Sequence, residues 1–194
     1  MGVLLSLSRS IDRFNHFLGR SVLWLVLLMV VVSAANALAR KLFHVGSNAM
    51  LEIQWYLFAA VFMLASGYVL ANNAHVRIDV LASRLSSRVR TWIDIVGFVV
   101  FVLPLCWLVI DLSWPVVSRA YVSGEISGNA GGLIRWPVYA LLPIGFGLVA
   151  LQSVSEIIKR VGFLRGLCPD PFAPPKSEGH LADAAATPLP EVKP

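Results

Sequence analysis

The residues that could do chemistry in this chain are few and scattered. One carboxylate, Glu52, stands near the start of a long apolar stretch, and His16, His44 and His75 all stand outside the middles of such stretches. A carboxylate within a span could serve a small autonomous multidrug-type exporter, and facing histidines could hold haem in a haem- or quinone-binding anchor of an oxidoreductase. The sequence shows no metal-ligand spacing and no nucleophile–base pair. We therefore expect no enzyme, and no cofactor or metal site in this chain.

Four apolar stretches must position these residues. Hydrophobic residues make up 57% of the 194 residues, charged residues make up 14%, and the mean hydropathy is +0.74. A helix of about 20 apolar residues crosses the roughly 30 Å hydrocarbon core, and a backbone in lipid must satisfy its own polar groups. These features predict an all-α integral membrane protein with four transmembrane helices. The predicted spans are approximately residues 20–40, 50–73, 92–116 and 136–158.

Basic residues are distributed unevenly between these stretches. If the N-terminus is inside, the segments that flank the spans hold ten Lys and Arg residues on the inner side and four on the outer side. Cytoplasmic segments carry the excess of Lys and Arg, so both termini are predicted to be cytoplasmic. A cleaved secretory signal is the alternative for the first stretch, because Ala37-Leu38-Ala39 imitates a cleavage site. Cleavage would leave three spans, and the stretch is longer than the about 7–15 residues of a signal core.

Local features refine the predicted helices. Residues 6–20 form a basic amphipathic lead, which we expect to lie along the inner membrane surface. Pro104 removes a helix hydrogen bond and should bend the third span. Glu156 stands three and four residues before Lys159 and Arg160, so it can pair with either on one helix face.

Acidic residues are expected only near the ends of the spans. Asp94 and Asp111 are interpreted as boundary groups, and no acid is expected near the centre of a span. Glu52 has two alternative interpretations. It either reaches water near the outer helix end, where the helix dipole favours an acid, or pairs with a basic residue of a partner. A self-sufficient ion-driven pump would need a central acid, so the pattern favours an accessory role.

The second loop predicts an interfacial helix at about residues 76–90. Its apolar residues fall on one arc of a helix, and a stripe of arginines lies beside that arc. Such a helix lies flat in the headgroup layer, where it either rests on lipid or braces a partner protein. From residue 166 the composition changes, and seven of the 11 prolines lie between residues 169 and 194. Residues 1–165 are therefore predicted as the membrane domain and residues 166–194 as a disordered cytoplasmic tail.

The order of several short motifs resembles the small permease subunit of tripartite ATP-independent periplasmic (TRAP) transporters. The similarity covers roughly residues 9–159. Its clearest pieces are Glu52-Ile53-Gln54-Trp55-Tyr56, Gly67-Tyr68, His75-Val76-Arg77-Ile78-Asp79, and Asn129-Ala130-Gly131-Gly132-Leu133-Ile134-Arg135-Trp136-Pro137. The last piece looks most like the mannitol/chloroaromatic-type branch, which includes 2-oxo acid importers.

The resemblance implies a small subunit of a sodium-coupled, binding-protein-dependent importer of small organic acids in a bacterial inner membrane. The implied partners are a large permease subunit, which would hold the substrate and the sodium ions, a periplasmic solute-binding protein and membrane phospholipids. No nucleic acid is expected. The small subunit would act as a scaffold for the large one and would help the binding protein to dock.

Three groups of residues are assigned to these expected contacts. The interface with the large subunit is assigned to Glu52, Trp55, Tyr56 and Arg77. Lipid contact through the interfacial helix is assigned to Arg77, Arg84, Arg88 and Trp92. Docking of the binding protein is assigned to the third loop, at Glu125, Ser127, Asn129 and Arg135.

Overall fold

The computed structural model describes residues 2–44, 46–72 and 85–168, and within these ranges the protein is built from helices. Its elements are α1 (Gly2–Phe43), α2 (Asn48–Ala71), α4 (Ser87–Gly97), η1 (Phe98–Val102), α5 (Leu103–Ser123) and α6 (Trp136–Leu164). Because α4, η1 and α5 follow one another without a break, they form one helix of 37 residues. The described residues thus contain four helices long and apolar enough to cross a membrane, which confirms the predicted all-α membrane protein.

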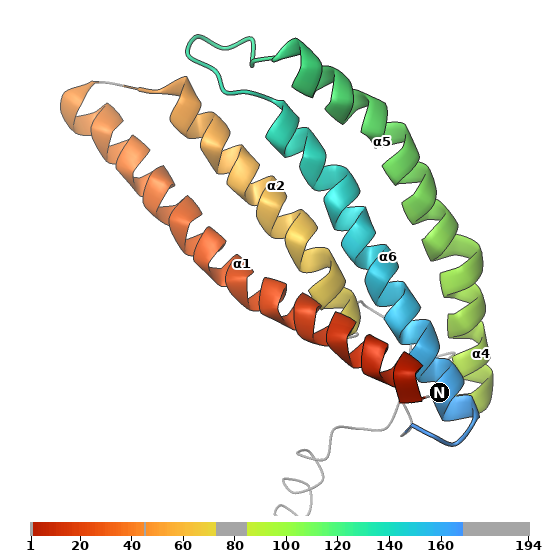
Figure 1. Cartoon of the computed structure of the whole chain (residues 1–194). Coiled ribbons are helices and arrows are strands. Elements are labelled where there is room, and N and C mark those ends of the chain that lie inside the picture. The colour runs from red at the N-terminus through yellow and green to blue at the C-terminus, as the bar shows by residue number, and fades with distance from the viewer. Residues whose placement is uncertain (1, 45, 73–84, 169–194) are drawn as a thin grey trace, which may run out of the picture.

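The helices lie side by side in one curved layer, in the spatial order α1, α2, α6, α5 (Figure 1). In its most apolar stretch α6 is 33% buried, against 6% for α2, because α6 contacts α1, α2 and α5, whereas α2 contacts mainly α1 and α6 among the described helices. Helix α1 begins and α6 ends at the same end of the layer, which we call the inner end. The other end, with the loop at residues 124–135, is the outer end.

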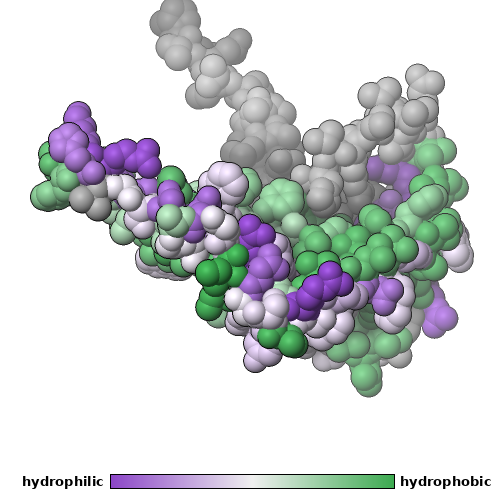
Figure 2. All heavy atoms as spheres, turned by 90° about the horizontal axis from the view of Figure 1, so that it is seen from above, coloured by the Kyte–Doolittle hydropathy of each residue, from purple (hydrophilic) through white to green (hydrophobic). Residues whose placement is uncertain are grey.

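A single layer leaves most side chains uncovered. The buried hydrophobic residues of the described chain are Val22, Ile95, Phe98, Cys106, Ala120 and Leu148. Seen from the outer end, hydrophilic residues gather over the helix ends, while strongly hydrophobic residues occupy the flanks (Figure 2). Lipid or a partner protein must cover these apolar flanks, because water would not solvate them favourably.

The structure of α1 contradicts the prediction for the basic lead. The basic lead at residues 6–20 is not a separate helix on the membrane surface, because it continues into the first span as part of α1. Its Ser8 and Asn15 are fully buried, and α1 contacts both α2 and α6. The lead is therefore held by protein contacts along α6, which the amphipathic pattern alone did not reveal.

The third crossing is irregular near the predicted bend. Residues Phe98–Val102 form a π-helix, and the backbone N–H of Leu103 donates to the carbonyl of Phe98. Pro104 follows at once and has no N–H to offer the preceding turn. A π-turn next to this proline accommodates the missing bond without ending the helix. The helix also runs to Ser123, beyond the predicted end at residue 116.

Candidate functional site

Two polar clusters stand at opposite ends of the layer. The outer-end cluster comprises the loop between α5 and α6 together with the start of α2. The loop reverses at two glycines, Gly124 and Gly131, whose φ angles of 62° and 72° favour a residue without a side chain. A single antiparallel bridge joins Ile126 to Ile134, and the N–H of Ser127 donates to the carbonyl of Leu133 at 2.9 Å.

Glu52 fastens this loop to α2. The Asn129 side-chain amide donates to Glu52 Oε1 at 2.7 Å, and the backbone N–H of Leu133 donates to Oε2 at 2.7 Å. Both carboxylate oxygens are thus occupied by the loop. The sequence had left Glu52 between a water-exposed end group and a partner's ion pair, and the structure adds this third role.

Two further contacts from α2 reach the loop backbone. The Tyr56 hydroxyl donates to the carbonyl of Ile134 at 3.2 Å, and the Asn48 side-chain amide donates to the carbonyl of Ala130 at 3.3 Å. Ser47 occupies the N-cap position of α2, but its side chain makes no capping bond. The loop is therefore held by side chains of α2 and not only by its own turns.

Glu125 and Arg135 form an exposed ion pair at the loop's base. Arg135 Nη1 lies 3.0 Å from Glu125 Oε1, and the side chains of Arg135 and Glu125 are 38% and 41% exposed. Arg135 also donates to the Tyr139 hydroxyl at 3.4 Å. The Tyr139 bond and then the Glu125 carboxylate raise the pKa of Arg135 above its usual value, so this cation stays charged. An exposed pair of this kind contributes little to stability, and both charges stay accessible at the surface.

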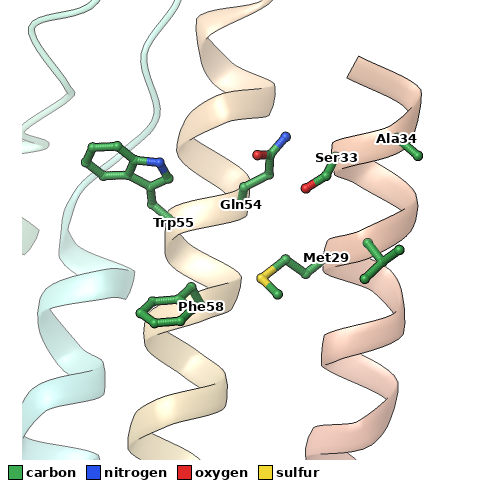
Figure 3. Close-up of a pocket in the computed structure, with 7 residues that line it drawn as sticks. Met29, Ser33, Ala34, Gln54, Trp55 and Phe58 are labelled. Carbon is green, nitrogen blue, oxygen red and sulfur yellow. The ribbon is translucent and has the colours of Figure 1, made fainter. Parts of the chain in front are cut away.

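The residues assigned to two separate contacts line one groove. It has a volume of about 590 Å³, and its walls include residues from both assigned sets. Those residues are Glu52, Trp55, Tyr56, Ser127, Asn129 and Arg135. Trp55 is 77% exposed and also borders a second groove of about 810 Å³ between α1 and α2. There Met29 and Ser33 point from α1 toward α2, and Gln54 points back (Figure 3).

Apart from the pairing of Glu156 with Lys159 or Arg160, the sequence reasoning missed the inner-end cluster. It joins the first turns of α1 to the last turns of α6 and to α4, and most of its side chains are buried. Its members are Ser8, Asp12, Asn15, Asp94, Gln152, Ser155, Glu156, Lys159 and Arg160. Their spacing of three and four residues along α1 and along α6 is a polar stripe on each helix, which is the signal that was available.

Arg160 is the centre of the inner-end cluster. Its side chain is 1% exposed and donates to Asp94 Oδ2 from Nε at 3.0 Å and from Nη2 at 2.9 Å. Nη1 donates to Glu156, which confirms the predicted i, i+4 pair, and Lys159 pairs with Glu156 as well. The guanidinium also lies 5.0 Å from the centre of the Phe98 ring. A buried guanidinium needs such paired carboxylates, because an unpaired buried charge is strongly destabilising.

Asp12 and Asn15 connect α1 to this cluster. Asp12 accepts from Lys159 at 3.2 Å, from Gln152 at 2.8 Å and from the Ser155 hydroxyl at 2.8 Å. The Asn15 amide donates to Gln152 Oε1 at 2.8 Å. The cluster therefore fixes α1 against α6 through hydrogen bonds and the Asp12–Lys159 ion pair.

Several predicted site residues belong to neither of the two clusters. Arg77, Arg84 and His75 are outside the described residues, as is most of the predicted interfacial helix. Arg88 is exposed in the first turn of α4, and Trp92 is 58% exposed.

The histidines of the haem alternative do not face one another where they are described. His16 packs edge-on against Tyr68, with ring centroids 5.2 Å apart, and His44 follows the end of α1. Within residues 2–44, 46–72 and 85–168, no three His, Cys, Asp or Glu side chains gather as they would around a metal ion.

A comparison of the chain with known protein families finds a match. The family model for the DctQ component of tripartite ATP-independent periplasmic transporters matches residues 29–162, which include α2, α4, α5 and most of α6. No curated protein and no solved structure was found to match the chain. The family is a transporter component, which agrees with the expectation of no enzyme and does not favour the exporter or haem-anchor alternatives. The matched part covers more than half of the sequence, and the chain belongs to the DctQ family of small TRAP transporter subunits.

Proposed function

We propose that this chain is the static membrane scaffold of a sodium-coupled importer of small organic acids, in a bacterial inner membrane with both termini cytoplasmic. The observation that carries the scaffold role is the single helix layer, which leaves broad apolar flanks uncovered. A tripartite transporter includes a large permease subunit and a periplasmic binding protein. The large subunit is the proposed cover of one flank. Sodium and substrate bind in that large subunit.

The outer-end cluster is the proposed docking surface for the binding protein. Glu52 holds the loop in one conformation before any partner arrives, so docking does not have to order the loop. Glu125 and Arg135 offer one charge of each sign at its base. Exposed charges of this kind steer association and set orientation more than they add affinity.

The flank around Trp55 is the proposed contact with the large subunit. A large exposed aromatic side chain beside a groove is the usual form of an interface anchor. Arg77 and Tyr56 were assigned to the same contact, and Arg84, Arg88 and Trp92 to lipid headgroups. Arg77 and Arg84 lie outside the described residues, so those assignments rest on the sequence pattern.

Binding-protein-dependent uptake into whole cells tests the docking role. Glu125→Lys and Arg135→Glu should each lower uptake at limiting binding protein, and Arg119→Glu is the matched control. Arg119 is exposed near the outer end of α5 but lies outside the loop. The double swap Glu125→Arg with Arg135→Glu restores the pair but exchanges the two charges. If the swap restores uptake, the pair only shapes the loop and the docking assignment is wrong.

Cysteine labelling tests the orientation. In a background with Cys106 and Cys168 replaced by serine, a cysteine at position 125 should react with a membrane-impermeant maleimide added to spheroplasts. A cysteine at position 88 should react only after the membrane is permeabilised. The reverse pattern would place the loop in the cytoplasm and exclude docking of a periplasmic protein there.

A further inference from the structure

Asp111 stands on the outward edge of the helix layer. It lies in α5 and is exposed, and within the described residues it makes no hydrogen bond or ion pair. The buried residues of α5 are Cys106, Ser113 and Ala120, which mark the face toward α6. At about 100° per residue, Asp111 points about 140–180° away from all three. Its side chain is therefore directed away from the other helices.

The depth of Asp111 differs from the sequence expectation. The Tyr121 and Trp136 rings meet edge to face, 5.5 Å apart, so Tyr121 is level with the start of α6. Asp111 comes ten residues before Tyr121, or about 15 Å deeper along the helix. Ile110 beside it shares a groove with Pro143 and Ile144, two turns into α6. Asp111 is therefore inside the span, whereas it had been interpreted as a boundary group.

The surroundings of Asp111 on this edge are apolar. Trp107, Leu108, Leu112 and Trp114 are exposed by 74%, 55%, 65% and 63%. Pro115 stands four residues after Asp111 and has no N–H, so it cannot donate to the Asp111 backbone carbonyl. Two kinds of acceptor, a carboxylate and a backbone carbonyl, are thus presented together from an apolar helix face. Polar groups at this depth are costly in lipid and normally face a partner or a water-filled cavity.

We propose that the Asp111 edge of α5 binds a transmembrane helix of the large permease subunit, which supplies an Arg or Lys side chain to Asp111. A cation with several N–H donors matches a carboxylate beside a carbonyl to which Pro115 cannot donate, and an ion pair in lipid requires both partners. The inference rests on the proposed scaffold function, because it takes the large subunit as the occupant. It adds a second contact, at the edge of the layer opposite α1, to the Trp55 flank.

Co-purification from the native membrane tests this contact. The tagged chain is expressed with its large subunit, and the amount of large subunit recovered per tagged chain is measured. Asp111→Leu and Asp111→Lys should lower the recovery by about tenfold or more, the size expected when one member of a desolvated ion pair is lost. Arg119→Leu is the matched control, since it removes a charge from the same helix near its outer end, where water solvates it. Its recovery should equal that of the unmodified chain.

The isolated chain supplies a readout that misfolding would not mimic. Asp111→Leu removes a carboxylate from an apolar surface, so the yield and melting temperature of the chain purified alone should stay equal or rise. A suppressor screen on Asp111→Lys, selecting for growth on the transported solute, should return an acidic residue in place of Arg or Lys in one helix of the large subunit.

Each other outcome contradicts a different statement. If the unmodified chain recovers the large subunit and Asp111→Leu recovers as much, the Asp111 contact is wrong and the scaffold function stands. If the unmodified chain recovers no large subunit, the scaffold function fails and the contact fails with it. If Asp111→Leu instead abolishes cross-linking between two tagged chains, the occupant is a second copy of this chain.

Discussion

The inner-end and outer-end clusters both hold helices together with polar side chains, yet they differ in burial and in composition. At the inner end, Arg160 and Glu156 are 1% and 3% exposed, and charged groups pair across three helices. At the outer end, Glu125 and Arg135 are each about two-fifths exposed, and the bonds run mostly between one carboxylate and a loop. Substitutions that break the buried cluster should therefore destabilise the packing of the helices. Substitutions that break the exposed cluster should change only the conformation of the loop.

The largest effect is expected at the centre of the inner-end cluster. Arg160→Met keeps an apolar stem over Phe98 but leaves Asp94 and Glu156 without their guanidinium. Removing one partner of a buried ion pair should cost about 3–5 kcal/mol of unfolding free energy. Thermal melting in lipid nanodiscs, followed by tryptophan fluorescence, measures the loss. Arg165→Met is the control, because Arg165 is exposed beyond the end of α6. If the two variants had the same melting temperature, the predicted difference in stability between the two clusters would be wrong.

Gly67→Ala should have the next largest effect, because it strains the same region through packing. A Cβ at this position would lie 2.5 Å from Asn15 Oδ1 and 3.2 Å from the Leu148 carbonyl. Overpacking of this kind costs about 1–3 kcal/mol. Gly97→Ala is the control, since a Cβ there meets nothing within 4 Å. Asn15→Ala should relieve part of the strain in the double variant. If the two substitutions are additive, Asn15 does not limit the space at Gly67.

At the outer end, Glu52→Gln should loosen the loop without melting the helices. The neutral amide loses the charge-assisted bonds from Asn129 and from the Leu133 N–H. Hydrogen exchange at Leu133 should become faster, while exchange at the middle of α6 stays unchanged. Glu125→Gln is the matched control, because its carboxylate pairs with Arg135 and not with Leu133. A large drop in the melting temperature of Glu52→Gln would show that the loop contributes to the packing of the helices.

The smallest effect is expected for Glu125→Gln itself. An exposed ion pair contributes little, so the melting temperature should match that of the unmodified chain. Raising the salt concentration should change the melting curve of neither the variant nor the unmodified chain. Salt screens the attraction between Glu125 and Arg135, which already contributes little to stability. A clear destabilisation that disappears in high salt would show that the two ends resemble each other more than their burial indicates.

The predictable part of the structure follows from periodicity and hydropathy. The four apolar helices and the pairing of Glu156 with Arg160 were readable because each depends on residues close in the sequence. The contact of Asp12 with Lys159 was not readable, because it joins positions 147 residues apart and requires the helix order. The depth of Asp111 was misjudged for a similar reason. The third span was predicted to end near residue 116, whereas α5 continues to Ser123 and its Tyr121 packs against Trp136.

The candidate site was predicted as residues but not as an arrangement. The assigned loop and the assigned start of the second helix are both at the outer end, yet the sequence treated them as two contacts. No local pattern shows that an acid in one helix accepts from a loop about 80 residues later. The sequence was sufficient to select Glu52 as a candidate site residue, because few acidic residues lie within the spans. The fold was needed to show that its carboxylate binds the loop.

The length of α1 gives the molecule a part that is held by contacts within the protein. Its 42 residues extend about 63 Å, whereas its apolar stretch from residue 21 to 39 accounts for only about 28 Å of that length. Residues 2–20, which precede that stretch, add nearly 30 Å toward the inner end of the layer, at about the 1.5 Å rise of each residue. There Asp12, Asn15 and the end of α6 form a hydrogen-bonded core of the kind found in water-soluble proteins. In bilayers of different thickness, the lipid cover of the apolar flanks should change. The contacts between the first half of α1 and the end of α6 should keep their geometry.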